Sequence, residues 1–67
     1  MALDEELSRR VLQVLKEAYP LDLPIEEVAK KSGIHRNTVA KYLAVLSAEG
    51  KIELRSVGKA KLYRLKK

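Results

Sequence analysis

The side chains best suited to chemistry lie on one side of a helix predicted over residues 35–49. Asn and Lys are interspersed there with alanines at helical spacing, and an Arg and a Thr flank the first turn. An Asn side chain bonds adenine in two places and Arg or Lys bonds guanine, so this set can read base edges. Small residues between them let a helix sit deep in a groove. The predicted reading face comprises Arg36, Asn37, Thr38, Ala40, Lys41 and Ala44.

Each feature of this helix also has a second interpretation. Alanines favour helix formation by themselves, so the reading face is otherwise an ordinary solvated surface. His35 stands where Ser or Thr is the usual cap, and it either bonds a phosphate or only closes the turn. Tyr42 falls at the edge of the inward face, and we expect it to contact a bound nucleic acid from there. The predicted inward face is Val39, Leu43 and Leu46.

A shorter helix, predicted over residues 24–32, precedes this one. Its first turn is acidic and its last turn is basic, which suits the helix dipole at both ends and predicts two ion pairs, Glu26–Lys30 and Glu27–Lys31. Gly33 supplies a left-handed cap, and Ile34 can fill the corner that follows. A helix that ends at Gly, a short turn and a second helix form the helix-turn-helix pattern.

The first predicted helix, residues 4–19, is apolar over about half of its circumference. Asp4 is its expected cap. Either a thin core uses every apolar residue within reach, or one edge of this stripe meets the same helix of a second copy. The second interpretation predicts a homodimer through this helix. Residues 21–23 alternate and form either a single short strand or a loop.

Two alternating runs around a turn that contains Gly58 predict a β-hairpin over residues 51–65. We expect Ile52 and Leu54 to face the core. Tyr63 and Leu65 should oppose them, with Leu62 pointing away from that core.

Basic side chains gather near the tip of this hairpin, at Arg55, Lys59 and Lys61. Lys on an edge strand blocks aggregation, so the charges have a protective interpretation. They also suit a basic wing that lies along the DNA backbone or enters the minor groove. The two interpretations are compatible.

Charge is divided unevenly along the chain. Residues 1–32 hold five basic and seven acidic side chains, a net −2, whereas residues 33–67 hold nine and two, a net +7. Such a basic half favours a polyanionic partner. Asn and Gln occur once each while Lys and Glu are abundant, which favours a thermophilic archaeal source.

The composition also excludes several classes. The 67 residues form one domain, and without cysteine they hold no disulfide and no Cys-based metal site. No nucleophile–base pair, Gly-rich phosphate loop or metal cluster is recognisable, so we expect neither an enzyme nor a cofactor. No apolar run is long enough to span a membrane, and a cytoplasmic protein is expected.

The predicted elements give a mainly α fold with a small β-hairpin, and this resembles the winged helix-turn-helix family of transcription regulators. Residues 33–39, 43–46 and 50–52 are similar to small bacterial and archaeal regulators of the ArsR and MarR type. The resemblance implies binding to double-stranded DNA, with the helix over 35–49 in the major groove and the hairpin as a wing. Paired His or Cys residues of metal-sensing members are missing, and no small-molecule ligand is expected.

Two alternatives accompany this resemblance. Winged helices also act as protein–protein modules of transcription or DNA-processing assemblies. Such a module has no general need for the net charge of +7 on residues 33–67. A related group binds left-handed Z-form nucleic acid through an Asn and a Tyr on the third helix and a Trp in the wing. This chain has Ala40 and Ala44 at those helix positions and no Trp.

Overall fold

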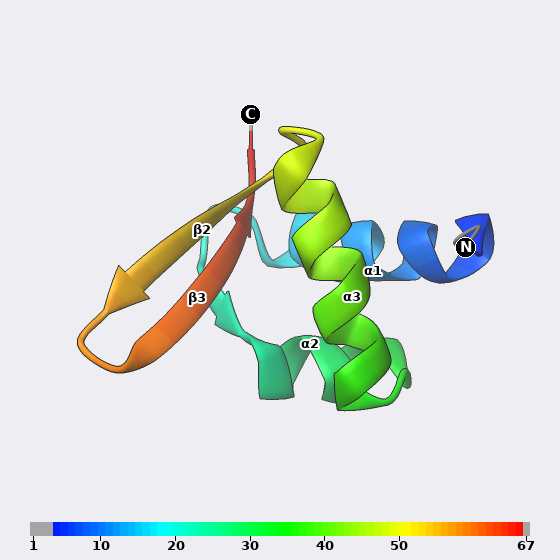
Figure 1. Ribbon diagram of the computed structural model, residues 1–67, viewed down its shortest axis with the longest axis horizontal. Coiled ribbons are helices and arrows are strands. Elements are labelled where there is room, and N and C mark those ends of the chain that lie inside the picture. The colour runs from blue at the N-terminus through cyan, green and yellow to red at the C-terminus, as the bar shows by residue number, and fades with distance from the viewer. Residues whose placement is uncertain (1–3, 67) are drawn as a thin grey trace.

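A computed structural model describes residues 4–66 as three helices and three strands. Their order is α1 (Glu5–Ala18), β1 (Leu23–Pro24), α2 (Ile25–Ser32), α3 (Arg36–Ala48), β2 (Ile52–Val57) and β3 (Ala60–Leu65). Helix α3 crosses in front of α1, and α2 lies at the lower end of α3 (Figure 1). The β2–β3 hairpin extends away from the helices (Figure 1). The predicted mainly α fold with a C-terminal wing is confirmed. Residues 1–3 and 67 of the predicted domain lie outside the described residues.

The helix ends follow from their capping residues. The carboxylate of Asp4 accepts a hydrogen bond from the amide of Glu6 at 2.8 Å, which confirms the predicted cap of α1. Helix α2 ends at Gly33, whose φ of +72° is the left-handed conformation that the sequence predicted there. Ile34 then fills the corner between α2 and α3 with only 7% of its surface exposed.

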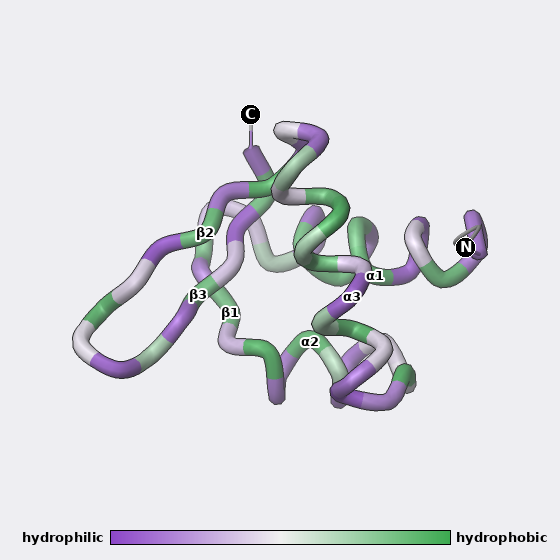
Figure 2. Tube along the Cα trace, viewed as in Figure 1, coloured by the Kyte–Doolittle hydropathy of each residue, from purple (hydrophilic) through white to green (hydrophobic). Residues whose placement is uncertain are grey.

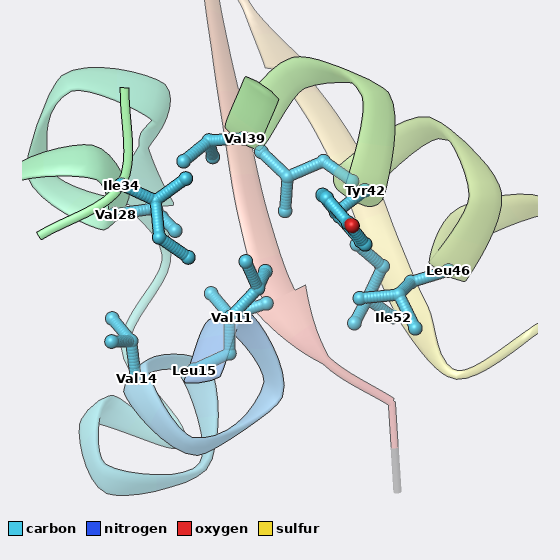
Figure 3. Packing of buried hydrophobic residues seen from close by; sticks show 10 residues of the cluster. Val11, Val14, Leu15, Val28, Ile34, Val39, Tyr42, Leu46 and Ile52 are labelled. Carbon is cyan, nitrogen blue, oxygen red and sulfur yellow. The ribbon is translucent and has the colours of Figure 1, made fainter. Parts of the chain in front are cut away.

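One cluster of apolar side chains joins the three helices and the base of the hairpin. Figure 3 shows these side chains pointing toward one another from α1, α2, α3 and β2. Val39, Leu43 and Leu46 are at most 1% exposed, so the predicted inward face of α3 is confirmed. Leu7 and Leu12 of α1 pack against the same cluster, which accounts for much of the wide apolar stripe on that helix.

The three strands form an antiparallel sheet in the order β1-β3-β2. Of residues 21–23, only Leu23 belongs to a strand: it pairs with Tyr63, and Pro24 after it pairs with Leu62. This pairing explains Leu62, which faces away from the core beside Pro24 and is only half-exposed. The predicted hairpin is confirmed, and its turn is two residues long because Val57 pairs with Ala60 at the end of the ladder.

Leu54 was predicted to face the core, and this prediction is wrong. Ile52 is 2% exposed but Leu54, two residues further along the same face, is 48% exposed. Tyr63, directly opposite Leu54 on the central strand β3, packs against the core, whereas Leu54 lies on the outer strand β2. Figure 2 shows apolar and polar residues alternating along both strands out to the tip. Alternation therefore continues past the point where the core ends.

Candidate nucleic-acid interface

Helix α3 begins with an imidazole cap. The Nδ1 atom of His35 accepts a hydrogen bond from the amide of Asn37 at 3.1 Å. His35 therefore does close the turn, which was one of its two predicted roles. Because Nδ1 accepts, the ring proton is on Nε2, on the far side of the ring. That N–H is a donor at the start of α3, where a phosphate also finds the free end of the helix.

The reading face is exposed to solvent as the helical spacing predicted. Arg36, Asn37, Ala40, Lys41 and Ala44 are exposed. Thr38 is half-buried. The two alanines leave a shallow strip between the longer polar side chains, so a groove of matching width can approach the helix closely.

Tyr42 does not belong to this face, and its predicted contact with nucleic acid is corrected. Its side chain is 4% exposed and lies among the core residues (Figure 3). The hydroxyl accepts a hydrogen bond from the amide of Asp4 at 2.8 Å. Tyr42 thus joins α3 to the start of α1. A Tyr at the edge of an apolar face can turn inward whenever a partner for its hydroxyl is at hand, and the spacing of residues along α3 gives no sign of a partner in another element.

Arg36 of the reading face is held by a carboxylate from the preceding helix. One of its terminal nitrogens (Nη2) lies 3.5 Å from Oε1 of Glu26, and both side chains are about two-thirds exposed. The ion pairs that the sequence predicted, Glu26–Lys30 and Glu27–Lys31, are not among those formed in residues 4–66. Glu26 stands at the start of α2, next to the start of α3, and Arg36 is the cation it meets.

A groove lies between the start of α3 and the wing. Arg36 and Glu26 line one side of it, and Lys59 and Lys61 line the other. Its remaining walls are Pro24, Ile25, Ala60 and Tyr63. Sequence reasoning placed cations on α3 and on the wing separately, and the structure brings both sets to one groove.

Arg55 differs from the lysines of the wing because it is already engaged. One of its terminal nitrogens (Nη1) lies 3.3 Å from Oδ2 of Asp22, whose side chain is only 17% exposed. Arg64 lies 3.8 Å from the other oxygen of Asp22 and donates to Glu53 at 3.0 Å. These four side chains link the segment before β1 with both strands of the hairpin. No spacing in the sequence indicates the whole network, although the Glu53–Arg64 pair follows from the hairpin register.

This network stabilises the charged form of Arg64. The hydrogen bond and ion pair with Glu53 raise the pKa of Arg64, and the nearby Asp22 and Tyr19 raise it further. The guanidinium is therefore held within the network. Among the predicted DNA contacts, the lysines outside any ion pair of the described residues are on the reading face and at the wing tip. Across residues 4–66, no carboxylate lies within ion-pair distance of Lys41, Lys59 or Lys61.

Within residues 4–66, no group of three or more His, Cys, Asp or Glu side chains is arranged to hold a metal ion. None of the helices in that range is both long and apolar enough to cross a membrane.

Two helices joined by a tight Gly turn, a third helix behind them and a hairpin beside the second define a winged helix-turn-helix domain. Residues 9–56 match the IclR helix-turn-helix domain, which is more than half of the chain. The chain belongs to this family. No curated protein matches it at a significant level.

Solved structures share the same fold. The homodimeric winged helix-turn-helix DNA-binding domain of Mb0332 from Mycobacterium bovis is 23% identical, with a TM-score of 0.75 over 90% of this chain. A structure of the DNA recognition and protein interaction domains of HOP2 is 28% identical, with a TM-score of 0.76 over 90% of this chain and 98% of that one. The Zα domain of PKZ from Carassius auratus, solved with Z-DNA, is 19% identical, with a TM-score of 0.79 over 92% of this chain and 95% of that one. The chain spans about half of the Mycobacterium domain, 53% of its length.

Proposed function

We propose that this domain binds double-stranded DNA in the B form and regulates transcription. In this proposal α3 enters the major groove and the wing follows the backbone or the minor groove. One observation carries it: the groove beside the reading face is lined by Arg36, Lys59 and Lys61, from two separate parts of the chain. A polyanion that runs past α3 meets cations from both parts, since phosphate contacts fix the orientation of a protein on a duplex.

The side chains of the interface have distinct tasks in this proposal. Asn37 and Lys41 read base edges from the exposed side of α3, and Thr38 supports them from its first turn. Arg36 contacts guanine or a phosphate once it leaves Glu26. His35 donates from Nε2 to a phosphate while its other ring nitrogen caps the helix. Lys59 and Lys61 neutralise backbone phosphates at the wing.

The direct test is a titration of duplex DNA by fluorescence anisotropy over a range of salt concentrations. With about five phosphates neutralised, log K should fall with log salt at a slope of about −4 to −5. The same chain should show no preference for DNA held in the Z form over B-form duplex, because Ala40 and Ala44 cannot make polar contacts from their side chains. Binding that ignores salt, or that requires Z-DNA, contradicts the proposal.

A single domain presents few base contacts, so we expect two copies to read two half-sites about one helical turn apart. The sequence predicted self-association through α1, and this stays a prediction. The apolar area left on α1 is small, because Leu7 and Leu12 pack against the core of their own chain.

The alternative of a protein–protein module is separated from DNA binding by charge reversal. Arg36→Glu and Lys41→Glu place acidic groups on the reading face without touching the core. If the domain binds DNA, the double variant should lose at least about a hundredfold in affinity for duplex, since each lost phosphate or guanine contact costs about tenfold or more. Unchanged DNA affinity together with loss of a protein partner would favour the module.

A further inference from the structure

The wing has a free strand edge. In the sheet order β1-β3-β2, strand β2 has a neighbour on one side only. Figure 1 shows no other described element along its outer side. An unpaired strand edge offers a row of N–H and C=O groups to another strand.

The hairpin register identifies which groups face that edge. The amide of Lys66 donates to the carbonyl of Lys51 at 3.1 Å, so this pair belongs to the hydrogen-bonded type. Hydrogen-bonded and non-hydrogen-bonded pairs alternate along an antiparallel ladder. Every second residue of β2 therefore bonds to β3, and those between direct their N–H and C=O groups outward. The outward set is Ile52, Leu54 and Ser56.

The side chains around Leu54 are suited to a copy of the same strand. Leu54 is 48% exposed on the face that bears the helices. Glu53 and Arg55 flank it on the opposite face, and their side chains are 44% and 65% exposed. Both are pre-ordered by the network with Arg64 and Asp22 but retain room for a second partner.

We propose that two copies of this chain associate through antiparallel pairing of β2 with β2, centred on Leu54. Leu54 then exchanges both backbone hydrogen bonds with the partner's Leu54, because its N–H and C=O groups already face outward. Glu53 lies opposite the partner's Arg55, and Arg55 lies opposite the partner's Glu53. Each flanking pair is of the closely spaced, non-hydrogen-bonded type, in which cross-strand ion pairs form most readily.

Charge selects this register over its neighbours. A shift by two residues in one direction places Glu53 opposite the partner's Glu53, and a shift in the other direction places Arg55 opposite the partner's Arg55. Like charges directly opposite each other destabilise a sheet. Strand β2 also contains no Lys and no Pro, two residues with which natural edges are commonly protected.

The pairing has a geometric consequence for the whole assembly. Two three-stranded sheets join into one sheet in the order β1-β3-β2-β2-β3-β1. Opposed residues of an antiparallel pair point to the same face, so Leu54 and the partner's Leu54 lie on one face of the joint sheet. Both sets of helices then lie on that face as well, with their two reading faces carried by a single platform.

Sedimentation equilibrium of the full chain, without DNA, tests the inference over a range of protein concentrations. The wild-type chain should form a dimer, and the amide of Leu54 should exchange with deuterium more slowly as the protein concentration rises. Leu54→Pro removes an outward N–H and leaves the bonds between β2 and β3 intact, since proline is tolerated where the N–H faces solvent. It should weaken the dimer at least about tenfold, because two symmetric hydrogen bonds are lost.

Charge neutralisation supplies the register test. Glu53→Gln and Arg55→Gln should each weaken the dimer about threefold to tenfold, and the double variant should be no weaker than either single variant, because every one of these changes removes the same two cross-strand ion pairs. Leu21→Ala is the matched control: it removes a leucine that is 67% exposed but lies outside β2, and should leave the dimer unchanged. Circular dichroism establishes that each variant is folded.

Three results would overturn the inference. One is a wild-type chain that stays monomeric at all concentrations. Another is a dimer that persists in folded Leu54→Pro, which would assign association to a different face such as α1. The third is a double variant, Glu53→Gln with Arg55→Gln, whose loss of affinity equals the sum of the two single losses. None of these depends on DNA, so they are separate from the test of DNA binding.

Discussion

The hydroxyl of Tyr42 accepts a hydrogen bond from the backbone amide of Asp4 at 2.8 Å. These residues are far apart in the sequence, and the bond ties the middle of α3 to the first turn of α1. Asp4 is also the cap of α1, so one residue both starts that helix and anchors the proposed recognition helix. The orientation of the reading face thus depends on a contact on the opposite side of α3.

We expect Tyr42→Phe to separate this structural role from DNA binding. The ring keeps its place in the core, and the lost hydrogen bond should lower the free energy of unfolding by about 0.5–1.5 kcal/mol. In a domain of this size each kcal/mol lowers the melting temperature by about 4–8 °C, which thermal denaturation detects. The salt slope of DNA binding should not change. A shallower slope would show that the Tyr42 hydroxyl does take part in DNA binding.

The two predicted roles of His35 separate in a pair of substitutions. His35→Ala removes the cap of α3 and should lower the free energy of unfolding by about 0.5–2 kcal/mol. His35→Asn replaces the capping imidazole nitrogen with an amide oxygen and should keep the stability of the wild type. If the Nε2–H also bonds a phosphate, His35→Asn should bind duplex DNA about three- to tenfold more weakly at unchanged stability. Full affinity in that variant would leave His35 as a cap alone.

The available lysines should each contribute to the salt dependence. Lys41→Gln, Lys59→Gln and Lys61→Gln should each reduce the magnitude of the log–log slope by about 0.9 if the lysine neutralises one phosphate. Lys16→Gln is the matched control, since Lys16 is exposed on α1, which lies behind α3 (Figure 1). A uniform change in all four variants would indicate a general charge effect and not a defined interface.

Glu26 should oppose DNA binding through its ion pair with Arg36. Glu26→Gln frees the guanidinium and removes a negative charge from the groove, so affinity for duplex should rise about three- to tenfold at low salt. The folded state should lose no more than about 1 kcal/mol, because exposed ion pairs contribute little.

Glu27→Gln is the matched control for this effect. Glu27 stands in the same first turn of α2 and has no ion pair with Arg36 among the described residues. It should alter stability to a similar extent through the helix dipole. An equal gain of affinity in both variants would show that the ion pair with Arg36 is not the cause.

The sequence by itself determined the elements and their faces. Gly33 ended α2, the spacing of Val39, Leu43 and Leu46 fixed the inward side of α3, and alternation around Gly58 gave the hairpin. These are local properties, because periodicity and turn chemistry act within one element. For the same reason the exposure of Asn37 and Lys41 was predictable.

Only the tertiary structure decided which faces are covered and which charges are already paired. Leu54 alternates correctly but is exposed on the outer strand of the sheet, Tyr42 turns inward because Asp4 lies within reach of its hydroxyl, and Arg36 meets Glu26 across a turn. Burial and ion pairing depend on where one element lies relative to another. That arrangement is a property of the packed domain, and no pattern within a single helix or strand contains it.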